Sequence, residues 1–181
     1  SSVRFVHPSL PYDALGDYYL ANLMNFNLGG TFDSRLNLKL REEKGWTYGA
    51  FSGFDGGREV GSFEFSGEFK GAATIDAITT TLEVLEAYAL TGPTQEEFQY
   101  MQNAVSQSEA LRYETPGSKL GLLDQILTYD LPLDYRNQQK ALLQATDRAT
   151  LSKLAASLLQ PENLAIIVVG DAATLKPLLQ Q

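Results

Sequence analysis

The segment GSFEFSGEF, at residues 61–69, alternates between two kinds of side chain. Its phenylalanines fall on one parity, and the other parity is polar, with Ser62, Glu64, Ser66 and Glu68. Because successive side chains of a strand point to opposite faces, this pattern predicts a β-strand with one apolar and one polar face. Such a strand fits a sheet that helices cover on one face only.

The rest of the chain predicts further strands and helices around this one. Strands are expected at residues 3–7, 46–54 and 164–169, and helices at 12–26, 33–45, 75–89, 94–105, 115–129, 135–144 and 147–158. The run LAIIVV at 164–169 is apolar throughout, so it is expected to be buried on both faces. This order predicts an α/β (α+β) fold, a two-layer sandwich in which helices cover one face of a mixed, mostly antiparallel sheet. Residues 1–181 are expected to form a single domain.

Composition excludes several classes of function. With 22 acidic against 14 basic residues and a net charge of −8, the chain is not expected to bind a nucleic acid. No apolar run approaches the ~18 residues of a membrane-spanning helix. There is no cysteine and one histidine, so a zinc site built on two or more histidines cannot form within this chain. We expect His7 to be structural or solvent-facing. Localisation stays open between a bacterial periplasm and cytoplasm, with the periplasm favoured.

Several polar or glycine-rich positions are better explained as structural than as functional. Gly29-Gly30 lacks the rest of a phosphate-binding motif and is expected to end a helix. Glu64 and Glu68 share a strand face but lie about 13 Å apart, beyond the spacing of a glycosidase acid/base pair. The remaining candidates lack a suitable base or fall near helix ends: Ser34, Ser52, Ser66, Asp130, Asp134 and Asp147.

Arg41 and Tyr48 are the remaining candidates for a chemical role. Arg41 falls in the last turn of the helix expected at 33–45, and Tyr48 lies near the start of the next strand. A helix that ends at Gly45 and turns into a strand can bring both residues to one rim. There, a guanidinium and a phenol can donate hydrogen bonds to a carbonyl or to the oxyanion formed from it. The alternative is structural, with Arg41 paired to a glutamate and Tyr48 in an aromatic core.

The segment LGGTFDSRLNLKLREEKGWTYGAFS, at residues 28–52, resembles the signature of the C-terminal homologous domain in the pitrilysin (insulinase) family of zinc metallopeptidases. The GSFEFSGEF strand, the following long helix, the GPTQEEF helix start and the LAIIVVGD strand extend this resemblance over essentially the whole chain. The resemblance implies an α/β domain that joins related domains, in one chain or in separate subunits, around a peptide chamber.

The resemblance also implies what each domain contributes. One domain of such peptidases carries the zinc motif H-x-x-E-H, which this chain lacks, so the chain resembles the partner domain that binds no zinc. By motif alignment, Arg41 and Tyr48 are the residues that this partner supplies to the active site facing it. Tyr48 would hydrogen-bond the tetrahedral oxyanion, and Arg41 would hold the substrate backbone. Arg35 is expected to be paired within the domain.

We therefore expect this chain to be the substrate-binding, active-site-completing half of a zinc-dependent peptidase, inactive alone. Its partners would be a zinc-bearing homologous domain or subunit and a peptide substrate, with zinc on that partner and no cofactor on this chain. Because the sequence opens directly at a strand, we expect an excised piece of a longer chain or of a multi-subunit enzyme. The alternative is a non-catalytic structural or assembly subunit of the same fold, which the presence of both Arg41 and Tyr48 disfavours.

Overall fold

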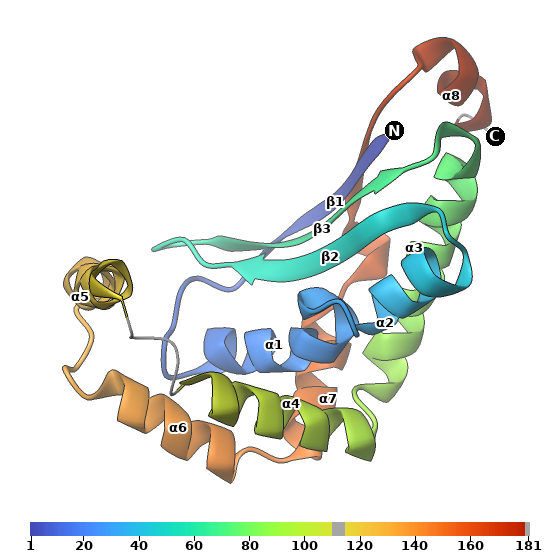
Figure 1. The fold of residues 1–181 in the computed structure, drawn as a ribbon. Helices are drawn as coiled ribbons and strands as arrows, with labels where there is room; N and C mark the ends of the chain where they lie inside the picture. Colours follow the sequence, from blue (N-terminus) through green and yellow to red (C-terminus); the bar gives the residue numbers. More distant parts are fainter. Residues whose placement is uncertain (110–114, 180–181) are drawn as a thin grey trace.

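The computed structural model describes residues 1–109 and 115–179 of the chain (Figure 1). The elements, in chain order, are β1 Ser2–Ser9, α1 Asp17–Asn25, the π-helical turn η1 Phe26–Gly30, α2 Arg35–Asn37, the π-helical turn η2 Leu38–Glu43, β2 Thr47–Asp55, β3 Gly61–Phe69, the short 3₁₀ turn η3 Gly71–Ala73, α3 Thr74–Thr91, α4 Gln95–Glu109, α5 Pro116–Tyr129, α6 Tyr135–Ala145, α7 Arg148–Leu158, the 3₁₀ turn η4 Pro161–Asn163, β4 Ala165–Val169 and α8 Ala172–Leu179.

The strands form one sheet in the order β2-β3-β1-β4, and each of these pairs is antiparallel. Figure 1 shows α1, α3, α4 and α7 on one side of this sheet. Among the described residues, no helix crosses the opposite side, which we call the open face. The predicted two-layer α/β sandwich, with helices on one face, is therefore confirmed.

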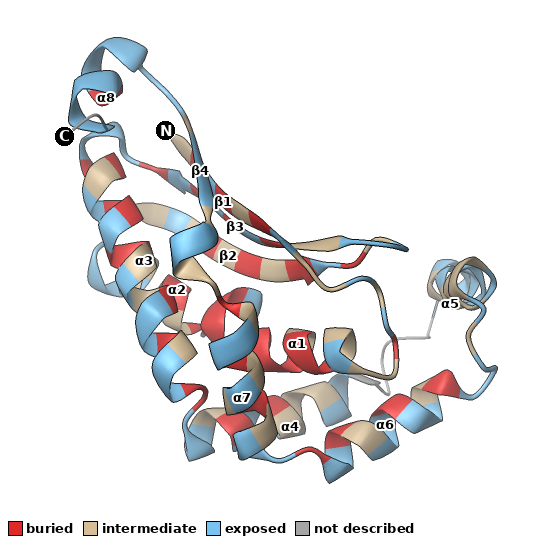
Figure 2. Ribbon diagram, turned by 180° about the vertical axis from the view of Figure 1, so that it is seen from behind, coloured by how far each residue is buried: buried red, intermediate tan, exposed pale blue. Residues whose placement is uncertain are grey.

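The alternation that predicted β3 is confirmed residue by residue. Phe63, Phe65 and Phe69 are buried, and the glutamates between them are exposed. Phe65 packs against Phe5 of β1, with the ring centroids 5.1 Å apart. Figure 2 shows that buried residues lie in these strands and in α1, which faces them. Removal of this apolar surface from water, at roughly 25 cal/mol per Å², holds the helix layer on the sheet.

The expectation that residues 164–169 form a strand buried on both faces is wrong. This segment is strand β4, but it lies at the edge of the sheet and pairs only with β1. Ile166, Ile167 and Val169 are exposed. A continuous apolar run indicates burial only where neighbours cover both faces. The described residues leave the open face of β4 and its outer edge uncovered. Helix α8, which follows β4, was also not predicted.

Two element boundaries differ from the sequence-based expectation. The first strand does not close before Pro8 but continues to Ser9, with Pro8 opposite Ser62 of β3. Because β4 pairs only with residues 2–6, Pro8 has one neighbouring strand, a position where its missing N–H is tolerated. The first helix begins at Asp17 rather than near residue 12, since Asp13 forms a turn by accepting a hydrogen bond from the N–H of Leu15.

Three predicted helix starts are confirmed by side-chain caps. Thr94 and Glu97 form a capping box, because each side chain accepts a hydrogen bond from the other residue's N–H. Thr115 caps α5, and Asp147 caps α7. In contrast, the side chain of Ser34 makes no capping hydrogen bond at the start of α2. None of the described helices is both long and apolar enough to cross a membrane.

Candidate functional site

Tyr48 is almost completely exposed, with 98% of its surface accessible. It lies at the start of β2, where the pairing with β3 shifts by one residue between Thr47 and Ala50. Such a β-bulge turns a side chain away from the direction that regular alternation would give it, and bulges are common next to active sites. The structure therefore excludes the alternative in which Tyr48 belongs to the aromatic core.

Arg41 lies in the π-helical turn η2, whose end leads directly into β2. Its guanidinium forms an ion pair with Glu42 at 2.8 Å, and its side chain is 39% exposed. The structural alternative for Arg41, pairing with a glutamate, is thus realised. However, an ion pair between two exposed side chains contributes at most about 1 kcal/mol, so Arg41 can exchange Glu42 for another partner at little cost.

Two phenylalanines that the sequence reasoning missed link Arg41 to strand β2. The guanidinium carbon of Arg41 lies 5.2 Å from the ring centroid of Phe32. Phe32 in turn packs edge-on against Phe51 of β2, at 5.0 Å between centroids. Both rings lie over Gly49, where a Cβ atom would come within 2.9 Å of Phe51. Arg41 and Tyr48 therefore belong to one corner of the molecule, beside the start of β2.

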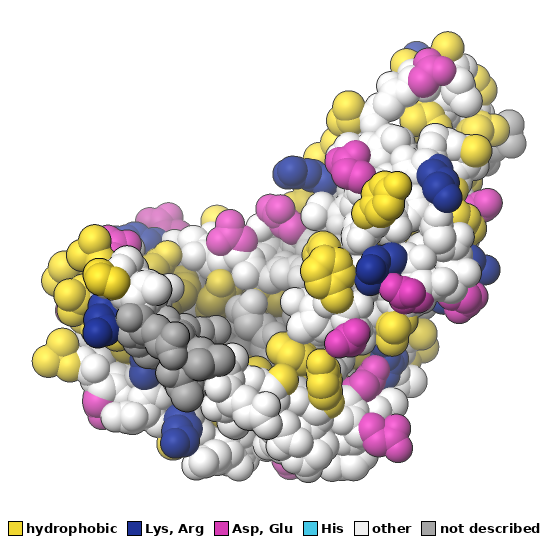
Figure 3. Space-filling model, in the orientation of Figure 1, with side chains coloured by type: hydrophobic (Ala, Val, Ile, Leu, Met, Phe, Trp, Pro, Cys, Tyr) yellow, Lys and Arg dark blue, Asp and Glu magenta, His cyan; other side chains and the backbone are white. Residues whose placement is uncertain are grey.

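A groove of about 320 Å³ adjoins Tyr48 at this corner. Its lining combines backbone and side chains from the start of β2 and the end of β3: Gly45, Trp46, Thr47, Tyr48, Glu68, Phe69 and Lys70. The Nζ atom of Lys70 donates a hydrogen bond to the carbonyl of Gly45 at 2.7 Å. Figure 3 shows hydrophobic, basic and acidic side chains next to one another over this part of β2 and α2.

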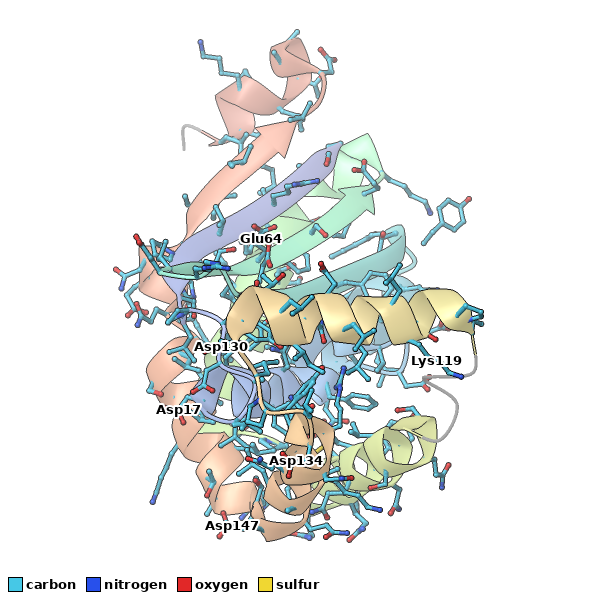
Figure 4. The ribbon with its side chains drawn as sticks, turned by 90° about the vertical axis from the view of Figure 1, so that its left-hand side faces the viewer. Asp17, Glu64, Lys119, Asp130, Asp134 and Asp147 are labelled. Carbon is cyan, nitrogen blue, oxygen red and sulfur yellow. The ribbon has the colours of Figure 1, made fainter. Side chains whose placement is uncertain are left out.

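The remaining polar side chains of the open face form a solvated surface, as predicted. Ser66 and Glu68 are exposed, and Glu64 accepts a hydrogen bond from Ser62. Figure 4 shows that Asp130, Asp134 and Asp147 lie apart from Glu64, at the ends of helices. Asp130 follows the end of α5, and the other two precede the starts of α6 and α7. These aspartates do not form a paired-carboxylate site.

The residues that the structure describes do not fit a zinc site. The imidazole of His7 is 3% exposed, its Nδ1 is 2.8 Å from the carbonyl of Pro8, and its ring stacks on Phe63. No three His, Cys, Asp or Glu side chains among residues 1–109 and 115–179 lie close enough together to hold a metal ion. Of the two roles expected for His7, structural or solvent-facing, this buried environment fits the structural one. Ser52 is likewise buried, and its hydroxyl donates to the side chain of Asn25.

Gly29 has the structural role predicted for the glycine pair. It lies next to the last residue of η1, the helical segment that packs against β2. A Cβ atom at this position would lie 2.6 Å from the backbone nitrogen of Ser52, a separation that real side chains do not reach. The absence of a side chain thus allows the helix layer to approach β2 closely.

Arg35 is paired within the domain, as predicted. Its guanidinium donates two hydrogen bonds to the carboxylate of Glu97, both at 2.7 Å, and a third to the carbonyl of Gly92. The guanidinium also lies over the ring of Tyr88, 4.6 Å from its centroid. This cluster joins α2 to α3 and α4. It therefore holds the start of α2, the helix that leads into the η2 turn with Arg41.

The Arg35–Glu97 pair should make stability depend on acidity. Burial alone would raise the pKa of Glu97, but the hydrogen bonds from Arg35 and Thr94 outweigh burial and hold the pKa below its ordinary value of 4.5. Because the folded state has the lower pKa, the pair stabilises fully above pH 4.5 and loses this contribution as the pH falls through the folded-state pKa. Lowering the pH from neutral to about 3 should therefore decrease the Tm of the wild type more than that of Glu97→Gln, as measured by thermal melting. An equal decrease in Tm for the wild type and Glu97→Gln would contradict the stabilising role given to the Arg35–Glu97 pair.

Comparison with known proteins identifies the family. A sequence profile described as the peptidase M16 inactive domain matches residues 2–105. No curated protein sequence gives a significant match.

Solved structures of similar fold include that of a peptidase M16 inactive domain from Pseudomonas fluorescens, with a TM-score of 0.82 and 25% identity over 91% of this chain and 39% of that chain. A protease from Helicobacter pylori has a TM-score of 0.79 and 15% identity over 91% of this chain and 40% of that chain. A proposed zinc protease from Bordetella pertussis has a TM-score of 0.74 and 16% identity over 94% of both chains.

The chain spans about two fifths of the length of the first two of these structures. The identities to the second and third are low, so those likenesses show the fold alone. The sequence profile, in contrast, covers more than half of the 181 residues. On this evidence, the chain belongs to the peptidase M16 inactive-domain family.

Proposed function

We propose that this chain is the substrate-binding, active-site-completing half of a zinc-dependent peptidase. The observation that carries the proposal is the placement of Tyr48, which projects from a β-bulge with 98% of its surface exposed. Arg41 lies in the helical segment that precedes this strand. A phenol held on a rigid strand and left open to solvent can donate a hydrogen bond to a group presented by a facing domain. The zinc ion and the water that it activates would come from that facing domain.

Tyr48 and Arg41 have different roles in this proposal. The O–H of Tyr48 donates a hydrogen bond to the oxygen of the scissile carbonyl and binds it more tightly as negative charge develops there. The guanidinium of Arg41 donates to backbone carbonyls of the peptide, for which its fork of N–H groups is suited. Because Arg41 is only weakly held by Glu42, peptide binding can replace that ion pair.

The domain would work as one part of a larger protein. Residues 1–181 would form one domain that pairs with a zinc-bearing homologous domain, either in the same chain or in another subunit. The Pseudomonas fluorescens and Helicobacter pylori chains, of which this chain covers 39% and 40%, have room for a second domain of this size. The open face would then form part of a peptide chamber.

Activity should appear only when the two halves are combined. This chain alone is expected to leave an unstructured peptide uncleaved, because no cluster of metal-binding side chains is found in the described part of the chain. With the H-x-x-E-H domain from the same or a neighbouring gene, it should yield an assembly that cleaves the peptide. The measurement is cleavage followed by mass spectrometry, with each half alone as a control. A stable assembly of both halves that cleaves nothing would instead support the structural-subunit alternative.

A further inference from the structure

Three backbone irregularities lie in or against β2, the strand that carries Tyr48. The first is the β-bulge between Thr47 and Ala50, and the other two are the π-helical turns η1 and η2, which both pack against β2. π-Helical turns and β-bulges are each enriched at functional sites, where they change the direction of particular side chains. In irregular backbone, some N–H and C=O groups lack the partners that a regular helix or strand would give them. Other groups, such as side chains, must therefore form hydrogen bonds with them.

Asn37 connects these irregular segments. Its side chain is fully buried. Its Oδ1 accepts a hydrogen bond from the N–H of Ala50 at 2.9 Å, and its Nδ2 donates to the carbonyl of Thr31 at 3.0 Å. One amide therefore binds the end of the bulge in β2 and the loop between η1 and α2.

Asn37 is linked to the segments that carry the two proposed site residues. Asn37 is the last residue of α2 and precedes Arg41 by one helical turn. Its partner Ala50 lies two residues after Tyr48, on the other side of the bulge. Within the bulge, the hydroxyl of Thr47 also bonds both the N–H and the carbonyl of Gly49. Side chains thus hold the backbone on either side of Tyr48.

We infer that Asn37 is a positioning residue, whose buried amide holds the Tyr48 bulge in place against the helical segment that carries Arg41. This inference rests on the proposed function, because it assigns Asn37 an effect on catalysis through Tyr48. Asn37 does not touch the substrate. A shift of the bulge would move the Tyr48 hydroxyl, and a displacement of about 1 Å in a positioned group can cost on the order of 10²-fold in rate.

Asn25 offers a matched control on the same strand. It is also buried, and it forms two hydrogen bonds with Ser52 of β2, one to the carbonyl at 2.7 Å and one from the hydroxyl at 2.6 Å. Ser52 lies beyond the bulge, where β2 pairs regularly with Phe65 of β3. The two asparagines therefore anchor the same strand, but only Asn37 anchors the part next to Tyr48.

The test compares Asn37→Leu and Asn25→Leu in the peptidase assembled from both halves. Both variants are expected to unfold more easily, because each leaves buried backbone or hydroxyl groups unsatisfied. Asn37→Leu should lower kcat by about tenfold or more with little change in KM, whereas Asn25→Leu should keep kcat within about twofold. Combined with Tyr48→Phe, Asn37→Leu should lower kcat by less than about twofold further, since positioning no longer matters without the hydroxyl.

A folded Asn37→Leu enzyme with wild-type kcat would overturn the inference, as would losses that multiply fully in the double variant. Should the leucine variant fail to fold, Asn37→Asp provides the same double-variant test, because it keeps an oxygen acceptor for the Ala50 N–H. The two proposals fail separately. If Tyr48→Phe alone keeps full activity, the proposed function is wrong. If Tyr48→Phe loses activity, but Asn37→Leu lowers kcat by the same factor with and without the Tyr48 hydroxyl, only the positioning role of Asn37 is wrong.

Discussion

Replacement of Tyr48 by phenylalanine should lower kcat of the assembled peptidase by about 10²–10³-fold, the usual loss when one oxyanion donor is removed. The substitution deletes a single O–H and keeps the ring. Because the side chain is 98% exposed, its removal breaks no packing within this chain. The fold and the melting temperature should therefore be unchanged, and the whole effect should appear in turnover. Steady-state peptide cleavage together with thermal melting of each variant provides the measurement.

Tyr129→Phe is the matched control for this experiment. Its hydroxyl lies at the far end of α5, 3.4 Å from the carbonyl of Gly56, away from the Tyr48 corner. The same chemical change there should leave kcat within about twofold of the wild type. A folded Tyr48→Phe enzyme with a kcat as high as that of the Tyr129 control would remove the main support for the proposed function.

Replacement of Arg35 by methionine should lower the free energy of unfolding by about 2–4 kcal/mol. Methionine keeps much of the aliphatic stem but leaves the carboxylate of Glu97 without the two hydrogen bonds that hold its charge. It also removes one of the two donors to the carbonyl of Gly92, leaving the Thr91 hydroxyl as the other, and removes the cation from the face of Tyr88. The pair is about one quarter exposed, so the loss should fall below that of a fully buried ion pair. Chemical denaturation monitored by circular dichroism gives this quantity.

A second ion pair on the same helical segment serves as a control, because it carries the same charges as the Arg35–Glu97 pair but is more exposed. Lys39 pairs with Glu43 at 2.8 Å, but both side chains are exposed. The Lys39→Met variant should lose much less stability than the Arg35 variant, because an exposed pair at this spacing contributes little. Equal losses in the Arg35 and Lys39 variants would show that the Arg35 cluster does not join the helices as the structure indicates.

Features that depend on neighbouring residues in the sequence were predictable. The alternation of β3 identified its two faces, and the GPTQEEF segment identified the start of α4, where Thr94 and Glu97 form a capping box. The apolar run of β4 was misjudged, although its type as a strand was correct. Its burial depends on which elements lie beside it, and the sequence of the run is the same whether or not a neighbour covers it.

For the candidate site, the sequence by itself determined that this chain has too few histidines and cysteines for a zinc site of that kind, and its motif singled out Arg41 and Tyr48. Only the tertiary structure decided that Tyr48 projects into solvent from a bulge and that Phe32 and Phe51 link Arg41 to the strand that carries Tyr48. It also decided that the amide of Asn37 holds the bulge through Ala50, thirteen residues away. The physical reason is that residue types set which chemistry is available. Exposure and hydrogen bonds between distant segments arise only when helices and strands pack together.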